Sequence, residues 1–123
     1  MSYTLTIENP FTREVSEQEV YDLITGTGAM SMPWWKSVKT YKSIDGGPAV
    51  YLEHDPAEEG GPLHTIVSLS DIVRAAGRAL APHLGATQGS DEHDAIHKGL
   101  GYLDAAGADN VLQIAVFGRA VFG

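Results

Sequence analysis

The chain has 123 residues, 43% of them hydrophobic, which fits one globular domain with a single core. It contains no cysteine, which excludes disulfide bonds and thiolate metal sites. Sixteen acidic residues against eight basic ones give a formal net charge of −8. This charge argues against a general nucleic-acid-binding surface, because phosphate binding requires positive charge, and it fits a protein that approaches a basic partner.

Neither a membrane span nor a leader peptide is predicted. No apolar run approaches the roughly 20 residues that a bilayer requires. The first ten residues lack the basic start and the long apolar stretch of a signal peptide. We therefore expect a cytoplasmic protein that does not bind a membrane.

The N-terminal part predicts a strand and then a helix. Residues 3–7 alternate apolar and polar side chains, which is the period of a half-buried strand, and an Asn-Pro pair at residues 9–10 closes it. Ser16 and Glu19 have the spacing of a capping box. This spacing predicts a helix over Glu17–Thr25, followed by a glycine stop.

A β-hairpin is predicted in the middle of the chain. Residues 26–33 have the small residues of a mobile loop. Residues 34–44 are rich in aromatic residues and lysine, and residues 49–53 are mostly apolar. An Asp-Gly-Gly turn at residues 45–47 separates the two segments and favours a hairpin. Residues 55–62 form an acidic loop behind it.

The clearest local pattern is a buried strand that leads into an amphipathic helix. Residues 64–67 are β-branched and apolar. Ser70 stands where an N-cap belongs, and Pro82 and Gly85 end the predicted helix. The apolar stripe of this helix comprises Ile72, Val73, Ala76 and Leu80.

The C-terminal part predicts two more helices. Ser90 is expected to cap a helix that continues to Leu103, although two glycines weaken it. Residues 105–108 are expected to break the chain, and Asp109 to cap a last short helix. Residues 119–123 could add an edge strand.

Together the predicted elements describe an α+β fold: a small, mostly antiparallel sheet with three or four helices packed against it. No internal repeat, low-complexity segment or linker divides the sequence. Residues 1–123 are therefore expected to form a single domain.

The last sixteen residues resemble a recurrent ending among small uncharacterised proteins from phages and mobile elements of high-GC Gram-positive bacteria. The matching residues are Asp109, Gln113, Phe117, Gly118, Phe122 and Gly123. That family also tends to carry a Trp near the start of a β segment and a Tyr several residues on, as Trp35 and Tyr41 do here. Where the family often has an acidic residue after Phe-Gly, this chain has Arg119. The resemblance implies a phage or plasmid context and no particular chemistry.

The first candidate site is a basic and aromatic patch in the predicted hairpin. It comprises Trp34, Trp35, Lys36, Lys39, Tyr41 and Lys42. Residues 34–44 carry a formal charge of +3, so the rest of the chain carries −11. Aromatic faces with lysines between them hold single-stranded nucleic acids or anionic ligands. The favoured alternative places the aromatic rings in the core and pairs the lysines across the hairpin with Glu53, Asp55, Glu58 or Glu59.

The second candidate site is the C-terminal motif, with Asp109 and Gln113 as binding residues. Gln113 is polar among apolar neighbours of the predicted last helix. A buried amide must find hydrogen-bond partners. The backbone of residues 118–122 and a second copy of the chain are the two sources considered, and a satisfied structural glutamine is the favoured interpretation.

A third pattern is the pair His93 and His97, one helical turn apart, which is the geometry of two metal ligands. No third ligand is evident nearby, so no metal site is predicted. A metal-dependent enzyme built on this pair stays open as an alternative.

We therefore expect a non-enzymatic accessory protein of a phage or mobile element that binds a host or phage protein in the host cytoplasm, without a cofactor. A homodimer is an open alternative for its oligomeric state. The first functional alternative is nucleic-acid or anionic-ligand binding through the lysine and aromatic hairpin, which the net charge disfavours for nucleic acid. Whether Trp34 and Trp35 are core or surface residues is left open.

Overall fold

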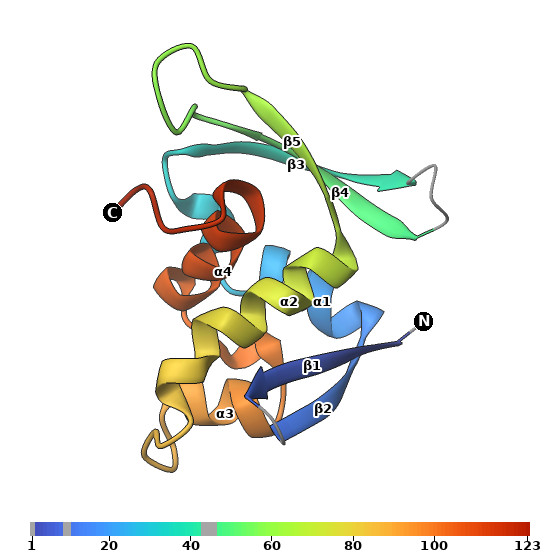
Figure 1. Cartoon of the computed structure of the whole chain (residues 1–123), viewed down its shortest axis with the longest axis vertical. Helices are drawn as coiled ribbons and strands as arrows, with labels where there is room; N and C mark the ends of the chain where they lie inside the picture. The colour runs from blue at the N-terminus through green and yellow to red at the C-terminus, as the bar shows by residue number, and fades with distance from the viewer. Residues whose placement is uncertain (1, 9–10, 43–46) are drawn as a thin grey trace.

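The computed structural model describes residues 2–8, 11–42 and 47–123 of the chain. Two small antiparallel sheets pack with helices in an α+β fold, as the sequence predicts (Figure 1). The strands are β1 (Ser2–Glu8), β2 (Phe11–Ser16), β3 (Trp35–Lys42), β4 (Pro48–His54) and β5 (His64–Ser68). The helices are α1 (Glu17–Thr25), α2 (Leu69–Leu80), α3 (Asp91–His97) and α4 (Ala105–Phe117), with 3-10 turns at Ala29–Ser31, Ala81–His83 and Leu100–Tyr102.

The first sheet is the hairpin of β1 and β2, of which only β1 was predicted. Leu5 and Val15 are fully buried, and they face the core from the two strands. β2 was missed because a half-buried Arg13 stands between Phe11 and Val15 and hides the alternation of its inward-facing side chains. Residues 9–10, which were predicted to close β1, lie outside the described residues.

Helix α1 has the predicted bounds and the predicted cap. The Ser16 hydroxyl accepts a hydrogen bond from the Glu19 backbone N–H at 3.1 Å. The Glu19 carboxylate does not return to the cap in the way a full capping box requires. It binds the Arg13 guanidinium at 3.1 and 2.8 Å and accepts from the Leu100 backbone N–H at 2.9 Å. Glu19 therefore joins α1 to β2 and to the segment after α3.

The second sheet has the strand order β3-β4-β5, and all neighbours are antiparallel. This confirms the predicted hairpin of β3 and β4, although residues 43–46, which hold most of the predicted turn, lie outside the described residues. Val50, Leu52 and His54 are buried on the inner face of β4, toward the helices. The intervening side chains of β4 point to the opposite face, because side chains alternate along a strand. Figure 1 shows this sheet lying across one end of the helical layer.

Helix α2 begins two residues earlier than predicted. Ser68, and not Ser70, is the N-cap, since its hydroxyl accepts from the Asp71 backbone N–H at 3.1 Å. The earlier start turns Leu69 into the core, where it is fully buried. Packing of Leu69 therefore decides between two serines with equal capping ability. β1 crosses α2 at Gly77, where a Cβ atom would overlap the carbonyl oxygen of Thr6.

The C-terminal third differs from its prediction in two places. α3 begins after Ser90 as expected but ends at His97, and a 3-10 turn replaces its predicted continuation. Asp104, and not Asp109, caps the last helix, with its carboxylate accepting from Gly107 N–H at 2.7 Å. Residues 105–108 therefore begin α4 where a break was expected.

The tail after α4 carries no strand. Gly118 ends α4 in the left-handed conformation at φ 81°, as the sequence predicts, but residues 119–123 form no edge strand. No helix in the described parts of the chain has the length and apolar character needed to cross a membrane.

Candidate functional site

The two candidate sites of the sequence meet in the structure. Trp34 and Trp35 lie at the start of β3, and both indole N–H groups donate to the same Asp109 Oδ1 of α4, at 2.7 and 2.6 Å. Trp35 is 4% exposed and Asp109 is 6% exposed, while Trp34 is half-buried. The tryptophans are thus inner-face residues, and the predicted cap residue Asp109 is instead a buried acceptor within the helix.

Gln113 lies one turn further along α4 and binds the C-terminal tail. Its Nε2 donates to Asp109 Oδ2 at 2.8 Å and to the Phe122 carbonyl at 3.2 Å. Its Oε1 accepts from the backbone N–H groups of Val121 and Phe122, at 2.6 and 2.8 Å. The amide therefore finds the backbone partners that the sequence considered for it, a few residues further along the same chain.

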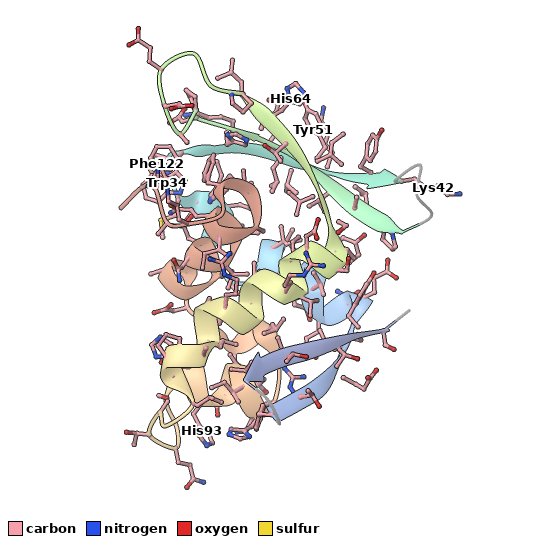
Figure 2. All side chains as sticks on the ribbon, viewed as in Figure 1. Trp34, Lys42, Tyr51, His64, His93 and Phe122 are labelled. Atoms are coloured by element: carbon pink, nitrogen blue, oxygen red, sulfur yellow. The ribbon has the colours of Figure 1, made fainter. Side chains whose placement is uncertain are left out.

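Aromatic rings complete this arrangement. Trp34 stacks on Phe122 with ring centroids 5.3 Å apart, and the two rings lie together at one end of β3 (Figure 2). Trp35 stacks on Phe117 at 6.1 Å, and Phe117 meets Phe122 edge to face at 5.8 Å. We call these residues the tail-anchoring cluster: Trp34, Trp35, Asp109, Gln113, Phe117 and Phe122.

His54 borders the tail-anchoring cluster and is itself fixed. Its ring meets Phe117 edge to face at 5.0 Å. Nδ1 lies 2.8 Å from the Asp55 carbonyl, which can only accept, so Nδ1 carries the proton. In the neutral ring Nε2 then accepts from the Thr65 hydroxyl at 2.9 Å. Both ring nitrogens are engaged in holding β4 to β5 and to the loop between them.

The polar side-chain groups of the tail-anchoring cluster all have hydrogen-bond partners within the chain. The Asp109 carboxylate receives three donors, and the Gln113 amide uses both its oxygen and its nitrogen. Buried indole N–H and amide groups need such partners, and here they have them. The arrangement therefore fixes the tail to the sheet and leaves neither tryptophan N–H available to a ligand.

The lysines do not form one patch with the tryptophans. Trp34 and Lys42 lie at opposite ends of the hairpin (Figure 2). Lys36 forms an exposed ion pair with Asp55 at 3.5 Å and donates to the Pro33 carbonyl at 2.8 Å. Lys39 and Lys42 are exposed and form no ion pair with any residue that the structure describes. Of the predicted cross-strand pairs, only the one to Asp55 is observed among those residues.

The opposite face of the same sheet carries aromatic rings that are exposed or half-buried and one exposed aliphatic side chain, Ile66. We call it the outer face, and the register assigns to it Ser37, Lys39, Tyr41, Ala49, Tyr51, Glu53, His64, Ile66 and Ser68. Tyr41 is 38% exposed and Ile66 is 46% exposed, and Leu63 just before β5 is 62% exposed. Tyr51 stacks on His64 at 5.3 Å, and Figure 2 shows both on the side of the sheet away from the helices.

Sequence reasoning found only part of the outer face. Lys39 and Tyr41 were candidates, but Tyr51, His64 and Ile66 were read as parts of buried or hairpin strands. The missing signal was the strict alternation in β5, where Val67 is buried and Ile66 is exposed. A run of apolar residues in a short strand hides this alternation.

His93 and His97 lie close together, as their spacing predicts. Their ring centroids are 4.5 Å apart, and the His97 ring also meets Phe11 edge to face at 5.5 Å. Among the described residues, no group of three or more histidine, cysteine and acidic side chains is arranged to hold a metal ion. His97 packs against the first hairpin and so has a structural contact.

No family model, curated protein sequence or solved structure gives a significant match to this chain. The resemblance of residues 108–123 to phage and mobile-element proteins therefore stays a prediction.

Proposed function

We propose that this chain is a non-enzymatic accessory protein of a phage or mobile element that binds a protein partner through the outer face. The observation that carries the proposal is the exposure of Tyr41 and Ile66 on one side of one sheet. An antiparallel sheet with one solvated face normally presents polar side chains to water. Exposed apolar side chains that gather on such a face are typical of protein interaction sites.

The charges on this face define the partner's chemistry. Lys39 lies in register with Tyr51 and Ile66. It forms no ion pair with a described residue, although residues outside 34–44 carry a formal charge of −11. A matching partner presents an apolar or aromatic surface with a carboxylate opposite Lys39.

A protein is favoured over a nucleic acid on this face. The two tryptophans that a stacking platform would use lie toward the helices, where Trp34 stacks on Phe122 and buried Trp35 stacks on Phe117. Glu53 lies in the same row as His64 and would repel phosphate groups. The net charge of −8 acts against a polyanion in the same direction.

The test compares two exposed positions. Tagged protein is used to capture partners from host lysate, and wild type, Tyr41→Ser and Gln88→Ser are compared by quantitative mass spectrometry. Gln88 is exposed and lies outside the outer face. We expect one protein to be enriched by wild type and by Gln88→Ser, and to be lost with Tyr41→Ser in the presence of nuclease. Equal retention by both variants would contradict the assignment.

A second copy of the chain is the competing occupant. Light scattering coupled to size exclusion, at two protein concentrations, decides this directly. We expect a monomer for wild type and for Ile66→Asp. A wild-type dimer that Ile66→Asp converts to a monomer would assign the outer face to self-association and overturn the proposal.

A further inference from the structure

A second, separate site is a cavity of about 570 Å³ between α1 and the segment that follows α3. It is a shallow recess that is broadly open to solvent. Its walls are formed by Ser16, Gln18, Glu19, Asp22, Gly26, Lys98, Gly99, Gly101 and Tyr102. None of these residues belongs to the outer face or to the tail-anchoring cluster, so the site is independent of the proposed function.

Two helices end at this cavity. Gly26 is the C-cap of α1, and Lys98 is the C-cap of α3. The carbonyl end of a helix carries partial negative charge, which favours a cation. The last turn of α1 contains no basic residue to balance it. The backbone around the cavity therefore attracts positive charge before any side chain is considered.

The side chains of the wall add to this preference. The Glu19 carboxylate is already neutralised by Arg13 at 2.8 Å, but exposed Asp22 accepts only from the Gln18 amide, at 3.0 Å, among the described residues. Lys98, which also lines the wall, forms an ion pair with Asp94 at 3.4 Å. Asp22 is thus the wall carboxylate that is available to a cationic ligand.

Tyr102 supplies an aromatic surface for the same cation. Its ring is 55% exposed, and the Lys98 ammonium of the same chain lies 5.9 Å from its centroid, so a bound cation would share the ring with this lysine. Rings of this kind attract ammonium and guanidinium groups, most often guanidinium. Gly101 allows the segment after α3 to lie close to α1, because a Cβ atom there would lie only 3.1 Å from Asp22 Cβ.

We propose that this cavity binds the guanidinium or ammonium group of an arginine or lysine side chain that belongs to a basic polypeptide. Asp22 provides the counter-charge, and the Tyr102 ring provides a cation–π surface. The open side suits a side chain that projects from a larger molecule, since a free small molecule would be enclosed on few sides. The net charge of −8 attracts such a polypeptide from a distance.

The test uses an acetylated Gly-Arg-Gly amide peptide and its citrulline counterpart, which has nearly the same shape without the charge. Binding is followed through the amide signals of Gly26, Gly99 and Gly101 in ¹⁵N-labelled protein at low salt. We expect saturable shifts with the arginine peptide and none with the citrulline peptide. Absence of saturable shifts with the arginine peptide, or equal shifts with both, would overturn the proposal.

Variants assign the site. Asp22→Asn is expected to weaken binding of the arginine peptide at least about tenfold, which corresponds to about 1.4 kcal/mol. Asp91→Asn makes the same change of charge on an exposed residue outside the cavity wall, and binding should stay within about twofold of wild type. Equal losses of affinity with both variants would mean that the peptide responds to the net charge of the protein, and would overturn the assignment of the site.

The source of the cation is tested with two free ligands. Arginine amide and spermidine should bind at least severalfold more weakly than the peptide. Binding of either as tight as the peptide would overturn the assignment to a polypeptide side chain. Tyr41→Ser should leave peptide binding unchanged, so that failure of the outer-face proposal and failure of this one are distinguishable.

Discussion

The two faces of the β3-β4-β5 sheet carry similar aromatic residues in different environments. On the inner face, Trp34 and Trp35 have hydrogen-bond partners for their N–H groups and stacked rings beside them. On the outer face, Tyr41 and Ile66 remain exposed on neighbouring rows. An aromatic residue in a strand is therefore a poor guide to function by itself. What separates the faces is whether another segment of the chain supplies a partner.

The largest effect is expected from removing the shared acceptor. Asp109→Ala leaves the N–H groups of Trp34 and Trp35 and the amide of Gln113 without their carboxylate. Each buried donor left without a partner costs about 1–3 kcal/mol, so the free energy of unfolding should fall by about 3 kcal/mol. Urea denaturation measures the fall, with Asp91→Ala as an exposed control. A loss no larger than that of the control would mean that the inner face is not held by Asp109.

A smaller effect is expected when the tail alone is released. Gln113→Ala removes the acceptor of the Val121 and Phe122 amides, and these half-buried groups can then be solvated. We expect a loss of about 1–2 kcal/mol in the free energy of unfolding and faster hydrogen exchange at both amides. Exchange rates that stay at the wild-type values would show that the aromatic contacts of Phe122 hold the tail without Gln113.

The N-cap of α1 belongs to neither face, and its removal should cost an intermediate amount of the free energy of unfolding. Ser16→Ala removes the acceptor of the Glu19 N–H and should cost about 1 kcal/mol. The denaturation midpoint of this variant should lie below those of the outer-face variants and above those of the inner-face variants. A midpoint unchanged within error would mean that the cap contributes nothing to stability.

The smallest effects are expected from the exposed lysines of β3, of which Lys39 lies on the outer face. Lys39→Gln and Lys42→Gln remove exposed charges that have no ion-pair partner among the described residues. The free energy of unfolding should change by less than about 0.5 kcal/mol for each. Lys36→Gln, which breaks the exposed pair with Asp55, should cost up to about 1 kcal/mol and less at high salt. A larger loss at Lys39 than at Lys36 would reveal a structural role on the outer face.

Local signals carried most of the fold prediction. The α+β class, the bounds of α1 and the pairing of β3 with β4 all follow from caps, alternation and turn residues within a few positions of each other. The errors arose where two nearby residues compete for one role. Ser68 caps α2 in place of the predicted Ser70, because Leu69 is buried in the core. Asp104 caps α4 in place of the predicted Asp109, because Asp109 is buried and binds tryptophans that are distant in sequence.

In the candidate site, too, local patterns identified residues but not the contacts between distant segments. The sequence identified Trp34, Trp35 and Gln113, but it placed them in two unrelated sites. Their meeting at Asp109 depends on packing across 74 and 75 residues of chain, which local patterns do not report. Exposure on the outer face was equally hidden, because it depends on which side of the sheet the helices cover.

The central claim is that the outer face receives a protein while the inner face is structural. Its most direct test is photo-crosslinking in host cells, with benzoylphenylalanine in place of Tyr41, and in place of exposed Gln88 as the control. The account predicts a single adduct from position 41 that resists nuclease, is destroyed by protease and is absent from the control. A nuclease-sensitive adduct, a crosslink between two copies of this chain, or the same adduct from both positions would contradict it.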